Sequence, residues 1–195
     1  MITKALLYCT KNQPALFYSV LDRKYMIGKD KPNDRFPNRL NGKVVAVCDI
    51  EVEEIEWLDS NYCSSDTGYC TDELSPCDLE RKSCLTTEQL KKYLWKNDKG
   101  YAIHIKNLKV FDEPHELHKT FEIGDVNISL PYKAPQNMQK CWAFEIMNGI
   151  VIPVSDYALI SIQPQWLVKI LNGEKTIEVR KKVLKEMLWK TQLKE

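Results

Sequence analysis

Hydrophobic and polar residues alternate over short stretches of this chain, which is the period of half-buried β-strands rather than of long helices. Strand patterns cover residues 4–10, 43–58, 100–111 and 157–162, and hairpin patterns cover residues 15–27 and 144–153. The stretch 43–58 is the longest, and its apolar side changes parity between Val52 and Ile55. Because a parity change within one strand indicates an extra residue, we expect a β-bulge near Glu53 and Glu54.

Three stretches have helical spacing instead. Residues 86–95 begin with an N-cap threonine and place three apolar side chains on one face. Pro164 begins a second helical pattern that stops at Gly173, and residues 183–195 form a third at the C-terminus. Many short strands with few helices in a chain of this length predict a single α+β domain over residues 1–195.

Residues 59–85 interrupt this pattern with a polar insertion rich in Ser, Asp, Thr and Gly, which we expect to be the least ordered part of the chain. Four of the seven cysteines recur in it at intervals of seven: Cys63, Cys70, Cys77 and Cys84. Zinc sites usually contain a C-x2–4-C knuckle, and none is present in the sequence, so we predict no metal and no cofactor. We expect Cys9, Cys48 and Cys141 in the core, and we do not expect disulfides.

Composition and charge limit the possible partners. The chain has 195 residues, of which 44% are hydrophobic and 28% charged, and its formal net charge is +1. With no overall basic field, non-specific binding to duplex DNA or to an anionic membrane is not expected, so a nucleic-acid site must be a local patch. No apolar run approaches the ~20 residues of a membrane span, and the first residues do not resemble a signal peptide. We therefore expect a cytoplasmic protein with no membrane partner.

Residues 160–182 carry the most informative pattern. The helix that begins at Pro164 and stops at Gly173 is followed by a strand with charged positions on one side. Lys175, Glu178 and Arg180 gather there within six residues. The unremarkable interpretation is an exposed strand face with a surface ion pair, which contributes ~0–1 kcal/mol. The alternative is a functional cluster of an ammonium, a carboxylate and a guanidinium.

The pattern G-x-K-x-x-E-x-R from Gly173 to Arg180, preceded by the sequence SIQP from Ser161, resembles the signature of ASCH domains. The resemblance implies a PUA-like fold: a small closed or partly open β-barrel with two to four flanking helices. Residues 7–11 (LYCTK) and residues 133–137 (KAPQN) are similar to further segments of phage and Firmicute members. The family implies a cleft, lined by the lysine, glutamate and arginine, that binds RNA or a nucleotide-like ligand.

The order of these segments differs from the family, where the motif precedes the YCTK strand. Here the YCTK strand opens the chain and the motif lies near its end. A circular permutation explains this order, because the termini of compact domains often lie close together. A swapped homodimer, in which the C-terminal segment completes a neighbour's barrel, gives the same sequence pattern. We favour the permuted monomer.

As a binding module, the protein would use its basic groups for a phosphate or a base edge, because a guanidinium offers a planar fork of donors. Lys181 could extend the basic rim, and Tyr132 or Trp166 could stack on an unpaired base, although burial of Trp166 is the expectation we prefer. The predicted ligand-binding residues are Lys175, Glu178, Arg180, Ser161, Gln163, Lys11, Lys133 and Gln136.

Two other functions are compatible with the sequence. One branch that resembles this fold is an amidohydrolase of acylated nucleosides with a threonine nucleophile three residues after the lysine. That position is Glu178 here, and the nearest hydroxyl is that of Thr176, which leaves Lys175 and Glu178 as the catalytic candidates, with Glu178 as a general base. The third possibility is a non-catalytic regulatory or assembly protein of a phage or prophage, with the cysteine-rich insertion as its interaction surface.

Overall fold

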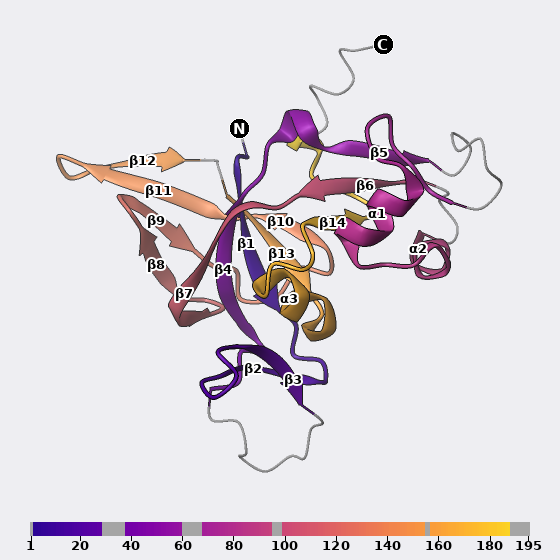
Figure 1. The fold of residues 1–195 in the computed structure, drawn as a ribbon. Helices are drawn as coiled ribbons and strands as arrows, with labels where there is room; N and C mark the ends of the chain where they lie inside the picture. The colour runs from indigo at the N-terminus through magenta and orange to yellow at the C-terminus, as the bar shows by residue number, and fades with distance from the viewer. Residues whose placement is uncertain (1, 29–37, 60–67, 95–98, 155–156, 188–195) are drawn as a thin grey trace.

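A computed structural model describes residues 2–28, 38–59, 68–94, 99–154 and 157–187 (Figure 1). The largest sheet has five strands, and its parallel pair β1 and β13 joins the two ends of the chain. The strands of this sheet, in spatial order, are β10 (Met138–Lys140), β13 (Tyr157–Ile162), β1 (Lys4–Cys9), β4 (Lys43–Asp49) and β7 (Lys106–Glu116). Both β1 and β13 are buried almost throughout, as central strands covered on two faces should be.

Three smaller sheets surround it. A four-stranded sheet contains β12 (Ile150–Val154), β11 (Trp142–Met147), β9 (Val126–Ser129) and β8 (Thr120–Ile123). A three-stranded sheet contains β14 (Ile177–Arg180), β6 (Lys99–His104) and β5 (Glu56–Asp59), and β2 (Ala15–Ser19) forms a hairpin with β3 (Lys24–Gly28). Among the described residues these sheets do not close into a barrel, because the edge strands β10 and β7 of the largest sheet do not pair with each other. The α+β class is confirmed, and a closed barrel is not.

The predicted strand 43–58 is wrong as a continuous element. It divides into β4, a 3₁₀ turn over Val52–Glu54, and β5 in a different sheet. Val52 and Ile55 are both buried, because a 3₁₀ turn brings positions three apart to the same side. The change of parity therefore marks the passage of the chain from one sheet to another, and not a β-bulge. The predicted strand 100–111 likewise divides into β6 and β7.

Three α-helices lie within the described residues: α1 (Pro76–Ser83), α2 (Thr87–Leu94) and α3 (Pro164–Leu171). The Ser75 side chain accepts a hydrogen bond from the Asp78 backbone N–H and so caps α1. Thr86 and Gln89 cap α2 reciprocally, since the Thr86 hydroxyl accepts from the Gln89 N–H and the Gln89 side-chain oxygen accepts from the Thr86 N–H.

The predicted polar insertion is a packed unit over its described part, residues 68–85. Leu74 and Leu79 from this segment pack with Leu90 and Leu94 of α2 in a separate buried cluster. The expectation of low order is therefore wrong for residues 68–85, and residues 60–67 lie outside the described part. Composition was misleading because a few well-spaced leucines are enough to attach short helices to a sheet.

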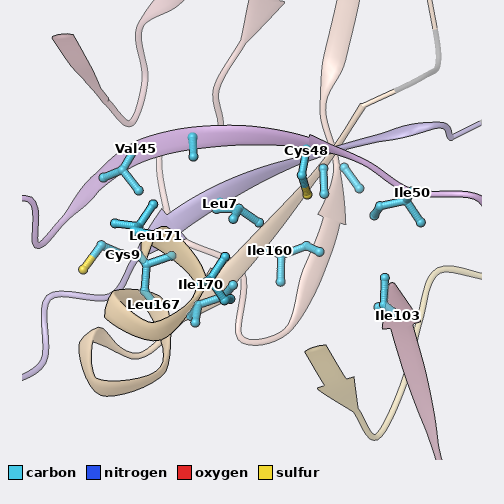
Figure 2. Close-up of a cluster of buried hydrophobic side chains, with 14 of the residues drawn as sticks. Leu7, Cys9, Val45, Cys48, Ile50, Ile103, Ile160, Leu167, Ile170 and Leu171 are labelled. Carbon is cyan, nitrogen blue, oxygen red and sulfur yellow. The ribbon is translucent and has the colours of Figure 1, made fainter. Parts of the chain in front are cut away.

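The main core lies between the five-stranded sheet and α3 (Figure 2). Leu7 and Ile160 from adjacent strands meet Leu167 and Ile170 of the helix. The expected core cysteines, Cys9, Cys48 and Cys141, are all buried, and burial raises the pKa of each thiol to about 12. These thiols stay protonated at neutral pH and are poor nucleophiles. Contrary to our expectation for disulfides, Cys70 is disulfide-bonded.

The C-terminal motif packs on its own chain. β13 pairs with β1 and β10, and β14 pairs with β6, so in this structure the segment contributes to the core of its own chain. The swapped homodimer stays a prediction. Of the predicted helix 183–195, the described part is a 3₁₀ turn at Lys185–Met187, and residues 188–195 lie outside the described part. No helix among the described residues is long and apolar enough to cross a membrane.

Candidate functional site

The ends of β1, β13 and β14 open onto a cavity of about 1020 Å³, which α2 and the segment 132–137 also line. All eight residues predicted from sequence to bind a ligand lie in its walls: Lys175, Glu178, Arg180, Ser161, Gln163, Lys11, Lys133 and Gln136. They come from four separate parts of the sequence, which the parallel pairing of β1 with β13 brings together at one edge. Their role in binding remains a prediction.

Lys175, Glu178 and Arg180 form one buried cluster. Their exposed fractions are 2%, 8% and 5%. The Lys175 Nζ lies 3.3 Å from Glu178 Oε2, and the Arg180 Nη2 lies 3.0 Å from Glu178 Oε1. One carboxylate is thus shared by two cations. The interpretation as an exposed surface ion pair is wrong, because the three groups are removed from solvent and held by a common network.

Lys175 is held by acceptors of the protein itself. Its Nζ donates to the backbone carbonyls of Ser83 and Ile177, each at 2.7 Å, in addition to its contact with Glu178. An ammonium has three donors, so these three acceptors account for its hydrogen-bonding capacity. Burial lowers the pKa of Lys175, while the neighbouring Glu178 acts in the opposite direction. The hydrogen bond from Lys175 to the Ser83 carbonyl also connects the insertion to the segment that leads into β14.

Arg180 links two sheets and keeps one donor free. Its Nη2 donates to the Ser161 backbone carbonyl at 2.6 Å, which joins β14 to β13. Its Nε is buried and has no hydrogen-bond partner within the described residues. The same holds for Thr10 Oγ1 and Gln165 Oε1, while the Gln165 Nε2 donates to Gln163 Oε1 at 2.6 Å. All three buried unpartnered atoms of the described residues belong to side chains that line this one cavity.

The cavity concentrates positive charge. Its described lining has a single acidic residue, Glu178. Its cationic lining residues are Lys11, Lys92, Lys133, Lys175, Arg180 and Lys181. Four of these lysines, all except Lys175, are exposed at its rim. Because the whole chain has a net charge of only +1, the excess of cations is a local property of this cavity.

Aromatic side chains lie among these charges. Burial raises the pKa of Tyr93, and the adjacent Arg180 partly offsets that shift. The Lys181 Nζ lies 5.2 Å from the centre of the Tyr93 ring, within the range of a cation–π contact. Tyr132 is 87% exposed at the mouth of the cavity, where its ring offers a flat, accessible surface. Trp166 is half-buried, lining the cavity while packing on the main core, which agrees in part with the expectation of burial.

Some lining residues were not predicted from the sequence. Gln89 and Lys92 face the cavity from α2 together with Tyr93, which the sequence pattern had assigned to an apolar stripe. Their spacing of three and four residues places them on one helical face, and that was an available signal. Thr10 and Gln165 adjoin predicted residues, whereas the Ser83 carbonyl leaves no trace in a sequence. Thr176, the hydroxyl considered for catalysis, is exposed and is not part of the described lining.

No protein-family model, no curated protein and no solved structure matches this chain.

Proposed function

We propose that the protein binds a nucleotide unit in this cavity, either as a free nucleotide or as an exposed nucleotide of single-stranded RNA. The observation that carries this proposal is the lining, which has six cationic side chains and one carboxylate; three of these charged groups, Lys175, Glu178 and Arg180, are buried. Exposed lysines at the rim suit a phosphate group, which they attract as point charges. Carboxamides such as Gln136 and Gln163 suit the edge of a base, since each offers a donor and an acceptor.

The size and shape of the cavity support the same ligand class. A volume of about 1020 Å³ is at the upper end of small-molecule sites, and is sufficient for a nucleotide. Tyr132 at the mouth and Trp166 in the wall offer surfaces on which a base can stack, a contact that contributes ~1–3 kcal/mol per base in single-strand binding proteins. The concave shape favours an unpaired nucleotide over a duplex, whose bases are covered by stacking.

We also propose that the fold is a permuted variant of the ASCH and PUA-like architecture. The segments that resemble the family meet in space despite their changed order: β1 ends within the YCTK sequence, at Cys9, and pairs in parallel with β13, which leads into the motif. The segment 133–137 lies in the wall of the same cavity. A permutation leaves such three-dimensional neighbourhoods intact, because it changes only where the chain is cut.

Binding is tested with uridine 5′-monophosphate and with a single-stranded hexauridylate, by calorimetry or fluorescence at fixed salt. The Lys133→Glu, Lys181→Glu double variant should weaken both ligands at least tenfold, because it reverses two exposed charges at the rim. The Lys24→Glu, Lys109→Glu double variant makes the same charge change at exposed positions of β3 and β7 outside the lining, and should leave binding unchanged. Binding of the hexanucleotide alone would identify RNA as the ligand. Equal affinities of parent and double variant would refute the proposed site.

Amidohydrolase activity is the second candidate, and the pair of Lys175 and Glu178 in the cavity wall favours it. Glu178 would act as the general base for a water molecule. In this reaction water would cleave the amide of an N-acylated nucleoside to a carboxylic acid and the free exocyclic amine. Release of acetate from N4-acetylcytidine by the parent, and its loss in Lys175→Ala, would establish the activity. Absence of turnover over a panel of acylated nucleosides would exclude it.

A further inference from the structure

The hairpin of β11 and β12 carries much of the exposed apolar surface of the molecule. Twelve large hydrophobic residues are exposed within the described part of the chain, and six of them lie on this one hairpin. They are Trp142, Ile146, Met147, Ile150, Val151 and Ile152, with exposed fractions of 40–66%. In Figure 1 the hairpin extends beyond β8 and β9 of its sheet. Single exposed hydrophobic residues are ordinary, whereas a contiguous group marks an interaction surface.

The outward face of this four-stranded sheet is divided into a polar half and an apolar half. On β8 and β9 its residues are polar: Thr120, Glu122, Asn127 and Ser129. On β11 and β12 its residues are apolar: Trp142, Phe144, Ile146, Val151 and Pro153. The opposite face packs on the core through Phe121, Ile128 and Ala143. Because the solvated face of an antiparallel sheet is normally polar throughout, the apolar half points to a partner on the side of β12.

β12 also has a free strand edge. It is the last strand in the order β12-β11-β9-β8, and within the described residues it pairs only with β11. The two-residue turn 148–149 has φ angles of 52° and 78°, as type I′ requires. Such a turn makes Met147 and Ile150 a hydrogen-bonded pair, so the alternation of the ladder directs the N–H and C=O of Val151 away from β11. Pro153 has the same orientation, which is where an edge strand tolerates proline.

We propose that β12 pairs in antiparallel fashion with β12 of a second copy of this chain, around a two-fold axis at Val151. The two four-stranded sheets then form one continuous sheet. The arrangement is self-complementary, because the Val151 N–H donates to the carbonyl of Val151 of the partner subunit and receives the reciprocal bond. β12 contains no charged residue, so no like charges meet between the copies. The opposite edge strand, β8, is protected by the exposed carboxylate of Glu122, as edges that stay unpaired commonly are.

A lipid surface is the other class of occupant for an apolar hairpin, and the main chain disfavours it. The outward N–H and C=O of Val151 would enter hydrocarbon without partners, which is costly for any open strand edge. Glu145, on the inner face of the same hairpin, would also approach the acyl chains. A protein strand satisfies the main-chain groups, and a second copy offers one that is equally apolar and uncharged.

Analytical ultracentrifugation of the full chain over about a hundredfold range of concentration tests the pairing. We expect the mass to rise from one chain to two. Val151→Lys places two like charges opposite each other and should weaken the dimer at least tenfold. Val20→Lys makes the same change at a valine that is 77% exposed outside the hairpin, and should leave the dimer intact. Mixing Val151→Lys with Val151→Glu should restore association, because opposite charges then face each other.

Val151→Pro tests the main-chain bonds themselves. It removes an N–H that points away from β11, so the hairpin and the melting temperature should be retained while the dimer is lost. Hydrogen exchange gives a second readout in the unmodified protein. Exchange of the Val151 amide should slow at least tenfold as the concentration rises, whereas the Ile152 amide, which faces β11, should be protected throughout.

A parent protein that stays monomeric at the highest concentration would overturn the inference. If that monomer cosediments with phosphatidylcholine vesicles, the hairpin binds lipid instead. A dimer that persists in both Val151→Lys and Val151→Pro also overturns it, and indicates another contact such as exchange of the C-terminal segment. Val151 lies outside the cavity lining, so binding of uridine 5′-monophosphate should be the same in these variants as in the parent. The dimer and the proposed function therefore stand or fail independently.

Discussion

Glu178 lies between two cations that have no other carboxylate near them in the described lining of the cavity. Its two oxygens face Lys175 at 3.3 Å and Arg180 at 3.0 Å, and all three side chains are buried. We expect Glu178→Gln to lower the free energy of unfolding by ~3–5 kcal/mol, because it leaves two buried cations uncompensated. In a chain of this size the melting temperature should fall by roughly 6–20 °C.

The matched control for this prediction is Glu174→Gln. Glu174 lies four residues earlier and is exposed, so its neutralisation should change stability very little. Lys175→Met should cost less than Glu178→Gln, because it leaves a balanced pair of Glu178 and Arg180 behind. If calorimetric melting gives the reverse order, the carboxylate does not hold the cluster together.

The lowered pKa of Lys175 predicts a pH dependence of stability. Between this lowered pKa and the usual lysine value of 10.5, the unfolded chain binds a proton that the folded protein does not. The free energy of unfolding therefore rises with pH across that window, as the cost of burying the ammonium is relieved. Denaturant unfolding at several pH values from neutral to alkaline should show the parent gaining stability relative to Lys175→Met. A constant difference between the two proteins would mean that burial does not perturb this lysine.

At the scale of elements, α2 has two functions in the structure. Leu90 and Leu94 hold it against the three-stranded sheet, while Gln89, Lys92 and Tyr93 form part of the cavity wall. The helix is eight residues long, so its ends matter for its stability. The reciprocal bonds between Thr86 and Gln89 are therefore connected to the shape of the cavity.

Thr86→Ala tests this connection. Thr86 is exposed, so the substitution removes the cap without opening a hole, at a cost of about 1 kcal/mol. We expect the melting temperature to fall by roughly 2–4 °C. We also expect weaker binding of uridine 5′-monophosphate, because the frayed helix positions its wall residues less well. Lys91→Ala, at an exposed site inside the same helix, should leave both measurements near the parent's values.

Elements with strong local signals were the ones that could be predicted. The segment from Tyr157 to Arg180 follows the expected order of strand, helix, glycine stop and strand, with Gly173 at a φ of +76°. The hairpins at residues 15–28 and 142–154 were also predicted, the second from its Asn148-Gly149 turn. The transition between β4 and β5 was not, because a change of parity is the same in sequence whether the strand bulges or ends. The packing of the insertion was also missed, because its few leucines are diluted by polar residues.

At the scale of the whole molecule, the cluster of Lys175, Glu178 and Arg180 joins parts that are distant in sequence. Lys175 reaches the carbonyl of Ser83 at the end of α1, and Arg180 reaches that of Ser161 at the end of β13. The same three side chains that line the cavity therefore also fix the insertion and two sheets relative to one another. The sequence indicated their convergence but not this second role, since their partners are backbone carbonyls. Substitutions in the cluster will affect stability as well as binding, which is why the rim lysines are the better probes of function.

The distribution of charge over the molecule leads to a final prediction. The net charge is +1, so electrostatic attraction for nucleic acid should be confined to the cavity and not spread over the surface. A single strand can place an unpaired nucleotide in the cavity, whereas a duplex cannot and gains little from the rest of the surface.

Single-stranded hexauridylate should therefore compete with a bound fluorescent nucleotide, while an RNA duplex of equal phosphate concentration should not. The affinity of the hexauridylate should fall only weakly as the salt concentration rises. One or two phosphate contacts correspond to a slope of log K against log salt concentration of ~0.7 per contact. The Lys133→Glu, Lys181→Glu variant should make that slope smaller. Equal competition by the duplex, or a steep slope unchanged in the variant, would show that attraction arises outside the cavity.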